Sequence, residues 1–271
     1  PLYYLPQKKG LVFASELKAF QAFPGFQSKL NEESFQHYLT FQYVPGNDTI
    51  LKNVYRLPPA HYLIWQDNKT TLEQYWELTI CPQEKPLTFF IEGIQERLQD
   101  AVSIHRRSDV ERGAFLSSGV DSSCVVALLR RMEGVKTYSV GCAGGKYNEL
   151  PQAAQTASFL DTQHRDTKVS SSLFWEKLPE IIWYQDEPVA DPAAAALYFV
   201  AGLAAKDVKV VLSGEGADEV FGGYSIYREP LSLMPFTQLP FLLKEPIKRL
   251  GKKLPKGFKG KSYIYRATTP L

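Results

Sequence analysis

The sequence predicts an α/β protein with a parallel, doubly wound sheet, preceded by a smaller α+β part. From about residue 87 onward, short apolar segments alternate with segments of helical periodicity, which is typical of a parallel sheet covered by helices. Loops of small residues directly follow two of the apolar segments, at 117–119 and 213–217. Residues 1–80 contain short strands and isolated helices without this alternation, as in an α+β domain.

The amino-terminal part is predicted from its turn residues and helix caps. Asn31 stands directly before Glu32 and Glu33, a strong helix start, and the helix that follows is expected to bury Phe35, Tyr38 and Leu39. The other signals predict strands at 3–5 and 11–14, a helix at 16–23 capped by Ser15, and a hairpin of 62–65 with 72–76 around 66–69.

Residues 81–88 are predicted to be a linker, because they include Pro82 and Pro86 and lie where the pattern changes. This divides the chain into an amino-terminal domain, 1–80, and a second domain, 89–271. The second domain is expected to begin with a helix whose apolar face is Phe90, Ile91, Ile94, Leu98 and Val102. It continues with strands at 113–116, 136–140, 164–169 and 209–212 and helices at 123–132, 149–160, 172–184 and 192–205.

The loop at 117–123 carries the first chemical signal. A small-residue loop between a parallel strand and a helix presents backbone N–H groups to an anion such as a phosphate. Ser117, Ser122 and Ser123 add hydroxyl donors, and Gly119 allows close approach. Asp121 next to a phosphate requires a cation between them, and Mg²⁺ is commonly bound by carboxylates together with substrate phosphates. The alternative is an ordinary helix cap with Asp121 or Ser122 as N-cap.

A second loop follows the strand at 209–212 and reads Ser213-Gly214-Glu215-Gly216-Ala217-Asp218-Glu219. Ligands of open α/β sheets bind at the carboxyl ends of the strands. If both loops open onto the same edge, Asp121 and Asp218 are able to share a magnesium ion and Glu215 lies near the substrate. The alternative is a turn followed by an acidic first helical turn, which the helix dipole favours.

Four further features allow either a purely structural interpretation or a functional one. The stretch 186–192 holds three carboxylates and two prolines, either as a site loop or as a solvated connection. Val140-Gly141 ends a strand and suits the edge of an adenine ring or an ordinary strand end. The lysine-rich stretch 244–261 is expected to be a solvated segment rather than a nucleic-acid surface, and we interpret His164 as structural.

Composition bounds the class of protein. The 271 residues are 44% hydrophobic and 22% charged with a net charge of +2, which is ordinary for a globular protein. No apolar run approaches the ~20 residues that span a bilayer. The three cysteines lack metal-site spacing, which favours a reducing cytoplasm, and Cys124 is expected to pack on an apolar helix face. Because the chain begins with Pro1, we expect it to be a piece of a longer protein.

These motifs together resemble a known family. Ser117-Ser118-Gly119-Val120-Asp121-Ser122 is similar to the SGGxDS pyrophosphate loop of N-type ATP pyrophosphatases, an adenine nucleotide alpha-hydrolase-like fold. Residues 212–224, Leu-Ser-Gly-Glu-Gly-Ala-Asp-Glu-Val-Phe-Gly-Gly-Tyr, resemble the signature of glutamine-hydrolysing asparagine synthetases, as do 138–141 and 186–191. Residues 1–4 and 13–18 resemble the end of that family's glutaminase domain, a class II amidotransferase of the N-terminal-nucleophile type.

The resemblance implies a ligase that uses ATP and Mg²⁺ to adenylate aspartate and then transfers ammonia derived from glutamine. No nucleic acid or membrane is implied as a partner, and a homodimer is compatible with the family. The implied ATP contacts are Leu116, Ser117, Gly119, Asp121, Ser122, Val140, Ser213 and Gly214. Asp121 and Asp218 are the implied magnesium ligands, and Glu215 is implied to position aspartate or its adenylate.

The sequence departs from the family at three points. Ser118 stands where the family has glycine. The amino-terminal cysteine nucleophile of the glutaminase would lie upstream, and no lysine in 244–261 matches the family's catalytic lysine, so the chain by itself is expected to lack turnover. The alternatives are a relative that adenylates another carboxylate, such as a β-lactam synthetase or lasso-peptide cyclase, and a nucleotide-binding homologue without catalysis.

Overall fold

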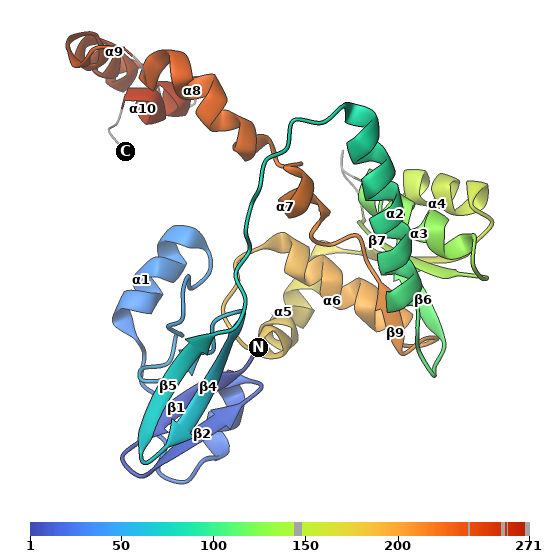
Figure 1. The fold of residues 1–271 in the computed structure, drawn as a ribbon, viewed down its shortest axis with the longest axis horizontal. Helices are drawn as coiled ribbons and strands as arrows, with labels where there is room; N and C mark the ends of the chain where they lie inside the picture. The colour runs from blue at the N-terminus through green and yellow to red at the C-terminus, as the bar shows by residue number, and fades with distance from the viewer. Residues whose placement is uncertain (144–147, 238, 256–257, 259, 269–271) are drawn as a thin grey trace. The chain divides into compact units, whose positions relative to one another are not determined.

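A four-stranded parallel sheet forms the middle of the chain, with the strand order β8-β7-β6-β9 (Figure 1). Its strands are β6 (Arg112–Phe115), β7 (Lys136–Cys142), β8 (Gln163–Val169) and β9 (Val210–Leu212). This computed structural model describes residues 1–143, 148–237, 239–255, 258 and 260–268. The chain forms two compact units, Pro1–Ser213 and Gly214–Leu271, and each is described by itself.

The first three strands are added outward from β6 in chain order, and β9 then returns to the free side of β6. The register confirms parallel pairing, with Ala114 opposite Thr137 of β7 and Leu212 of β9. Strands added in opposite directions from a common centre form a doubly wound sheet. The predicted fold class is therefore confirmed.

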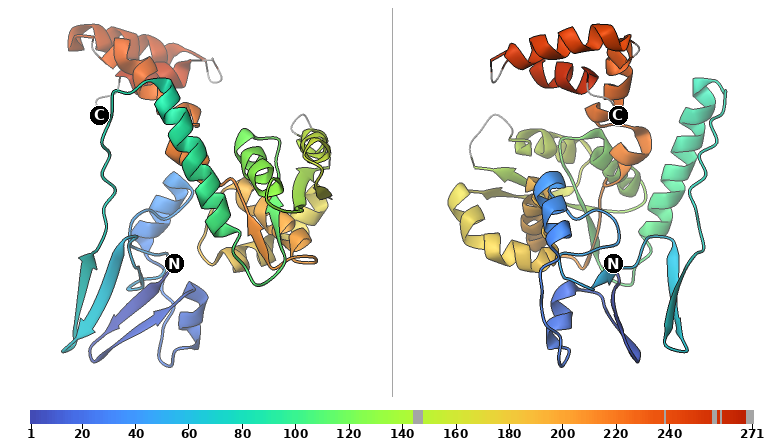
Figure 2. Two further views of the ribbon diagram at one scale, coloured as in Figure 1. Left: turned by 45° about the vertical axis from the view of Figure 1, so that its right-hand side comes forward. Right: turned by 90° about the vertical axis from the view of Figure 1, so that its left-hand side faces the viewer.

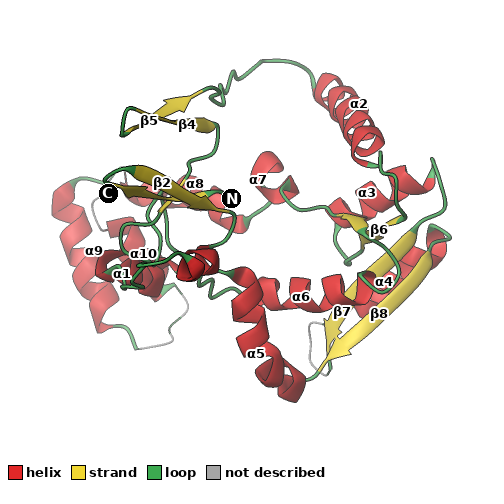
Figure 3. Ribbon diagram, turned by 90° about the horizontal axis from the view of Figure 1, so that it is seen from below, coloured by secondary structure: helices red, strands yellow, loops and turns green. Residues whose placement is uncertain are grey.

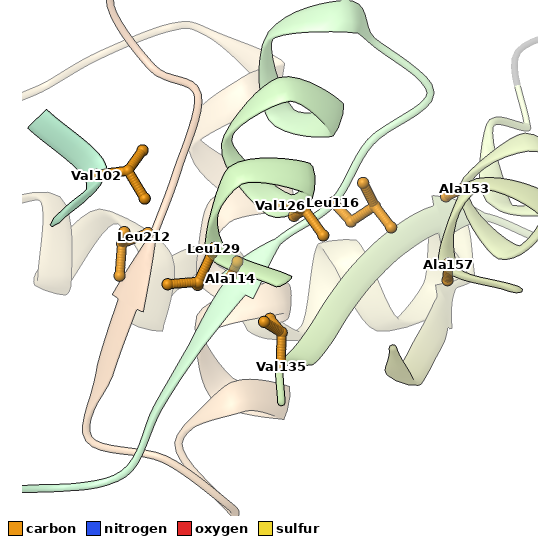
Figure 4. Close-up of a cluster of buried hydrophobic side chains, with 9 residues drawn as sticks. All are labelled: Val102, Ala114, Leu116, Val126, Leu129, Val135, Ala153, Ala157 and Leu212. Carbon is orange, nitrogen blue, oxygen red and sulfur yellow. The ribbon is translucent and has the colours of Figure 1, made fainter. Parts of the chain in front are cut away.

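Both faces of this sheet are covered because successive side chains along a strand point to opposite sides. One core contains Ala114 and Leu116 of the β6 segment, Leu212, and side chains of α2 (Leu87–His105), α3 (Val120–Arg130) and α4 (Leu150–Phe159) (Figure 4). The other core packs Tyr138 against Val200 and Ala204 of α6 (Pro192–Ala204). The helix α5 (Ser171–Gln185) precedes α6, and Figure 3 shows both beside the strands.

The amino-terminal part contains a small antiparallel sheet in the order β2-β1-β3. Its strands are β1 (Tyr3–Gln7), β2 (Gly10–Ala14) and β3 (Tyr55–Arg56), and its core holds Tyr3, Leu5, Leu17, Phe20 and Val54. Also here are the 3-10 helix η1 (Leu17–Ala22), the helix α1 (Glu32–Phe41), and a hairpin of β4 (His61–Gln66) and β5 (Lys69–Gln74) (Figure 2).

The second unit is helical in the part that the structure describes. It contains α7 (Ala217–Phe221), η2 (Ser225–Arg228), α8 (Glu229–Thr237), α9 (Phe241–Lys253) and α10 (Lys261–Thr268), and α10 contacts both α8 and α9. The lysine-rich stretch expected to be an irregular solvated segment is therefore largely on helix α9. Residues 256, 257 and 259 of that stretch lie outside the described residues.

Several local predictions were wrong because burial depends on partners far along the chain. Phe35 and Leu39 are exposed rather than buried, as are Phe90, Ile91 and Ile94 of α2. Cys124 is exposed, because α3 turns Ser122, Val126 and Leu129 toward the core instead. The first helix is a 3-10 helix whose N-cap is Glu16, not Ser15. The predicted hairpin around residues 66–69 is confirmed, with Asp67 and Asn68, both with positive φ, at its turn.

The two faces of α3 provide a test of the core. We expect Leu129→Ala to lower the free energy of unfolding by about 2–5 kcal/mol, because it removes buried methyl groups and leaves a cavity. Cys124→Ala on the exposed face of the same helix should change it by no more than about 0.5 kcal/mol. Urea denaturation followed by circular dichroism measures both, and similar losses in the two variants would contradict the assigned core face.

His164 provides a second test, through pH. Its Nδ1 lies 3.0 Å from the hydroxyl oxygen of Thr137, while its buried Nε2 has no hydrogen-bond partner among the described residues. Burial lowers the pKa of His164, against a smaller opposing effect of Asp166. The unfolded chain therefore binds more protons than the folded one below about pH 6.5, and stability falls as the pH drops through that range. The melting temperature of His164→Gln should fall less between pH 7.5 and pH 5.5 than that of the unchanged protein.

Candidate functional site

The carboxyl ends of β6 and β9 lie side by side at one edge of the sheet, since the two strands are parallel neighbours. The chain continues from β6 into a loop and α3, and it leaves β9 through Ser213, the last residue of the first unit. The strand order reverses at this pair, which is the point where open α/β sheets bind ligands. The two predicted loops therefore start at the same edge.

Serine side chains hold the backbone of the first loop. The hydroxyl oxygen of Ser122 accepts a hydrogen bond from the Ser117 N–H at 3.1 Å and lies 2.9 Å from the Ser117 Oγ. The Ser117 Oγ in turn accepts the Gly119 N–H at 3.1 Å. Ser122 is buried, whereas residues 117–119 are exposed. The buried Ser122 side chain thus anchors the loop, while residues 117–119 remain exposed to solvent.

The helix α3 begins without a side-chain cap. Its N-cap is Gly119, with φ −75° and ψ 154°, so the alternative that Asp121 or Ser122 caps the helix is wrong. A Cβ at Gly119 would lie 3.2 Å from the Ser117 Oγ, so the close approach of that hydroxyl favours glycine here. The amides of an uncapped first turn remain available to a ligand.

One amide of the loop already binds a carboxylate. The Ser118 N–H donates to the Glu149 Oε2 at 3.3 Å. Glu149 is the N-cap residue of α4, yet its side chain makes no capping bond to that helix. The loop therefore binds a negatively charged oxygen within the structure itself, as expected of an anion site.

The serine at position 118 does not distort the loop. Ser118 is absent from the residues with positive φ and is exposed. A residue with negative φ accommodates a Cβ without backbone strain. The side chain that replaces the family's glycine is therefore compatible with the loop conformation.

Asp121 lies in the first turn of α3, half-buried. Within the described ranges its carboxylate makes no hydrogen bond or ion pair with another residue, so both of its oxygens are available to a cation. The part of the chain that the structure describes holds no cluster of three or more His, Cys, Asp and Glu side chains able to bind a metal. A magnesium site made of one or two carboxylates plus phosphate oxygens does not need such a cluster.

Val140 lies in β7, and Leu116 directly follows the last residue of β6. The side chain of Leu116 is buried in the α3 core, its N–H donates to the Tyr138 carbonyl at 2.9 Å, and its carbonyl accepts the Ser139 hydroxyl. Val140 is partly buried against the α6 core. Gly141 is needed for packing, because a Cβ there would lie 2.6 Å from the Leu150 Cγ.

The acidic segment after Ser213 belongs to the second unit. Gly216 and Gly222, with φ 91° and 67°, flank the short helix α7, which contains Asp218 and Glu219. A Cβ at Gly223 would lie 1.9 Å from the Asp218 Oδ1, so the carboxylate takes the space that a side chain would need. The Tyr224 hydroxyl donates to Glu219 at 2.9 Å, and this bond raises the pKa of Tyr224 to about 12.

Sequence reasoning missed two side chains that bond to the backbone at the end of β6 and in the loop after it. Glu149 accepts the Ser118 N–H, and the Ser139 hydroxyl donates to the Leu116 carbonyl. A signal for Glu149 was present, because it follows a predicted strand of the same parallel sheet and so had to lie near the same edge. Ser139 lies in the stretch 138–141 that resembles the family signature, but no contact was predicted for its side chain.

Comparison with known proteins identifies the family. Residues 93–269 match the sequence model described as asparagine synthase, and residues 1–76 match that of a glutamine amidotransferase domain. The chain belongs to the asparagine synthase family. The resemblance seen in the sequence motifs is therefore confirmed.

Individual relatives agree with this. The chain is 38% identical to glutamine-hydrolyzing asparagine synthetase 1 of Bacillus subtilis (strain 168) over 100% of the chain and 43% of the relative. It is 39% identical to a protein of Mycobacterium tuberculosis (strain H37Rv) named "putative asparagine synthetase, glutamine-hydrolyzing", again over 100% of the chain and 43% of the relative. It is 29% identical to amidase chry2 of Gibberella zeae over 84% of the chain and 36% of that protein. The chain thus spans less than half the length of these relatives.

The serine network provides a test of the loop. Ser122→Ala removes the acceptor of the Ser117 N–H, so we expect binding of inorganic pyrophosphate with Mg²⁺ to weaken about tenfold as the loop loses its anchor. Ser123→Ala is the matched control, because among the described residues that hydroxyl bonds to the Gly119 carbonyl alone, at 2.7 Å. Isothermal titration measures both, and equal affinity of Ser122→Ala and the unchanged protein would contradict the anchoring role.

Proposed function

We propose that the full-length protein converts aspartate to asparagine in an ATP-dependent reaction that uses ammonia derived from glutamine. Family membership and the names of the relatives support this proposal. The observation that carries it is the loop after β6, where the Ser118 amide, just before an uncapped helix start, donates to a carboxylate oxygen. Serine hydroxyls lie beside it, as does Asp121, whose carboxylate has no partner among the described residues. Such a loop suits the pyrophosphate of a nucleotide.

The proposed reaction has two steps. An oxygen of the aspartate side-chain carboxylate attacks the α-phosphorus of ATP, and the bond from that phosphorus to the bridging oxygen breaks, which releases pyrophosphate and forms β-aspartyl-AMP. The nitrogen of ammonia then attacks the β-carbonyl carbon, loses a proton, and AMP leaves with its electron pair. The products are asparagine, AMP and pyrophosphate.

The loop would stabilise the first step by electrostatics. Negative charge develops on the departing pyrophosphate, and preorganised N–H and O–H donors aimed at that charge lower the barrier. Ser117, Gly119 and Ser122 are the proposed donors, with Leu116, Val140, Ser213 and Gly214 as further ATP contacts. Mg²⁺ would neutralise phosphate charge when bound, and Asp121 fits as a ligand because its carboxylate is free of partners among the described residues.

Other assignments rest on the sequence motif. Asp218 is the proposed second magnesium ligand, and Glu215 the residue that positions aspartate or its adenylate. Residues 1–80 are proposed to be part of the glutaminase domain, 81–88 the linker and 89–271 the synthetase domain. In the described part of the chain no helix is long and apolar enough to cross a membrane, and the three cysteines are free. We propose a cytoplasmic location on the grounds of those free thiols.

A different carboxylate substrate is the alternative. One of the relatives is named as an amidase rather than an asparagine synthetase, so the family includes proteins with other names. β-Lactam synthetases and lasso-peptide cyclases would share the adenylating loop and differ in the acceptor pocket. A homologue that binds the nucleotide without catalysis would show ATP binding and no exchange.

The test is ATP–pyrophosphate exchange by the full-length protein with Mg²⁺, with and without L-aspartate. We expect aspartate-dependent exchange, and Asp121→Asn should lower it by about a hundredfold or more because charge neutralisation at the phosphates is lost. Asp100→Asn, at an exposed position of α2, is the matched control. Exchange that requires another carboxylate would support the alternative substrate. If the folded protein shows no exchange with any carboxylate, the protein is a homologue that binds the nucleotide without catalysis.

A further inference from the structure

The segment 186–190, between α5 and α6, bonds to three separate pieces of the amino-terminal part. Asp186 binds the start of η1, Glu187 pairs with Arg56 of β3, and the Ala190 N–H donates to the Gln42 carbonyl at 2.9 Å. The partners of Asp186 lie 168 and 169 residues away in the sequence. The segment therefore connects two regions that are distant along the chain.

Asp186 provides the cap that η1 lacks. The helix has Glu16 at its N-cap position, but Glu16 makes no side-chain capping bond. Instead the carboxylate of Asp186 accepts the N–H groups of Leu17 and Lys18, the latter at 3.0 Å. The first amides of a helix have no partner within it, and a carboxylate at this position is an effective cap. Asp186 performs this role from another region of the chain.

The geometry around Asp186 is specific. Its side chain is only 8% exposed, and its backbone has φ 65° while its N–H ends α5 by bonding to the Ile182 carbonyl. The Lys18 ammonium lies 3.4 Å from the same carboxylate, 3.0 Å from the Trp183 carbonyl, and 5.3 Å from the centre of the Trp183 ring. Three donors and a ring contact thus converge on the carboxyl end of α5.

The neighbouring ion pair is also shielded from water. The side chains of Arg56 and Glu187 are 24% and 14% exposed. Burial raises the pKa of Glu187, and the charge and hydrogen bond of Arg56 oppose that shift. Removing one member of such a pair leaves an uncompensated charge, which costs more than removing both.

On its other side the same segment leads into the parallel-sheet domain. Asp191 caps α6 by accepting the Ala193 N–H at 2.9 Å, and α6 packs Val200 and Ala204 against Tyr138 of β7. The α5 helix joins the segment to β8. The bonds of 186–190 therefore connect the amino-terminal part to the helices α5 and α6 beside the four-stranded parallel sheet.

We propose that the segment 186–190 couples the glutaminase part to the synthetase part, with Asp186 as a positioning residue that fixes the two in register. This inference rests on the proposed function, because coupling matters only if ammonia formed in one part is used in the other. Asp186 touches no reacting atom in this role. Its effect is on the supply of ammonia rather than on adenylation.

Hydrogen exchange tests the contact directly. Asp186→Asn keeps a residue type that tolerates positive φ but leaves one neutral oxygen in place of a carboxylate. We expect amide exchange in peptides covering residues 17–22 of the full-length protein to speed up about tenfold, the loss expected for a hydrogen bond to a charged group. Asp161→Asn is the matched control, because Asp161 also has positive φ and, among the described residues, its side chain pairs with Arg130 alone, at an exposed site. Unchanged exchange in Asp186→Asn would overturn the capping role.

The coupling is tested by measuring asparagine formation with glutamine and, separately, with ammonium chloride. Asp186→Asn should lower the glutamine-dependent rate about tenfold and leave the ammonia-dependent rate close to that of the unchanged protein. A parallel fall of both rates, or a fall of neither, would overturn the coupling role. If the unchanged protein forms no asparagine from ammonia, the proposed function itself is wrong and the coupling role is wrong with it.

The ion pair gives a second set of variants that do not touch Asp186. Arg56→Met should lower the ratio of glutamine-dependent to ammonia-dependent rate more than the double variant Arg56→Met with Glu187→Gln, because the single change strands the buried Glu187 carboxylate. A double variant at least as impaired as the single one would overturn the role assigned to this pair.

Discussion

The parallel pairing of β6 with β9 is the constraint on which the site depends. The segment of β6 lies between β7 and β9, and its middle residues Gly113 and Ala114 are small and buried. At Gly113 a Cβ would lie 2.7 Å from the Tyr138 ring and 2.8 Å from the Lys136 carbonyl. A larger residue there would push β7 away from β6. Close packing of these strands is what brings the ends of β6 and β9 to one edge.

The loop that follows β6 is anchored by a buried side chain and is accessible to a ligand from the solvent side. Ser122 is buried and holds Ser117, while residues 117–119 face solvent. Hydroxyl groups are suited to this, because one oxygen both donates and accepts. The Ser118 amide of this loop donates to the Glu149 carboxylate, so the loop already bonds to an oxygen of an acidic side chain. Hydrogen bonds from the serine side chains thus fix the conformation of the loop. The free amides at the uncapped start of α3 favour a negatively charged ligand there.

Within the first unit, contacts between distant segments hold the amino-terminal part against the segment 186–190. The carboxylate of Asp186 caps η1 from a distant segment, and Glu187 pairs with Arg56. In both contacts a charged side chain is shielded from water and bonded to a specific partner. Such pairs add little net stability compared with apolar packing but strongly disfavour any arrangement in which one partner is missing. They are therefore suited to fixing the register between two parts whose proposed chemistry is sequential.

The sequence by itself determined much of the order of strands and helices, the helix start at Asn31, the loop at 117–123 and the family, because each depends on residues close together in the chain. It did not determine which faces are buried. Cys124 was expected to pack on an apolar helix face and is exposed, and Phe35 and Leu39 of α1 were expected to be buried and are exposed. Neither the trans cap by Asp186 nor the bond from Ser118 to Glu149 has a local signature. Only the tertiary structure decided these, because burial and long-range hydrogen bonds depend on partners that folding brings together from far along the chain.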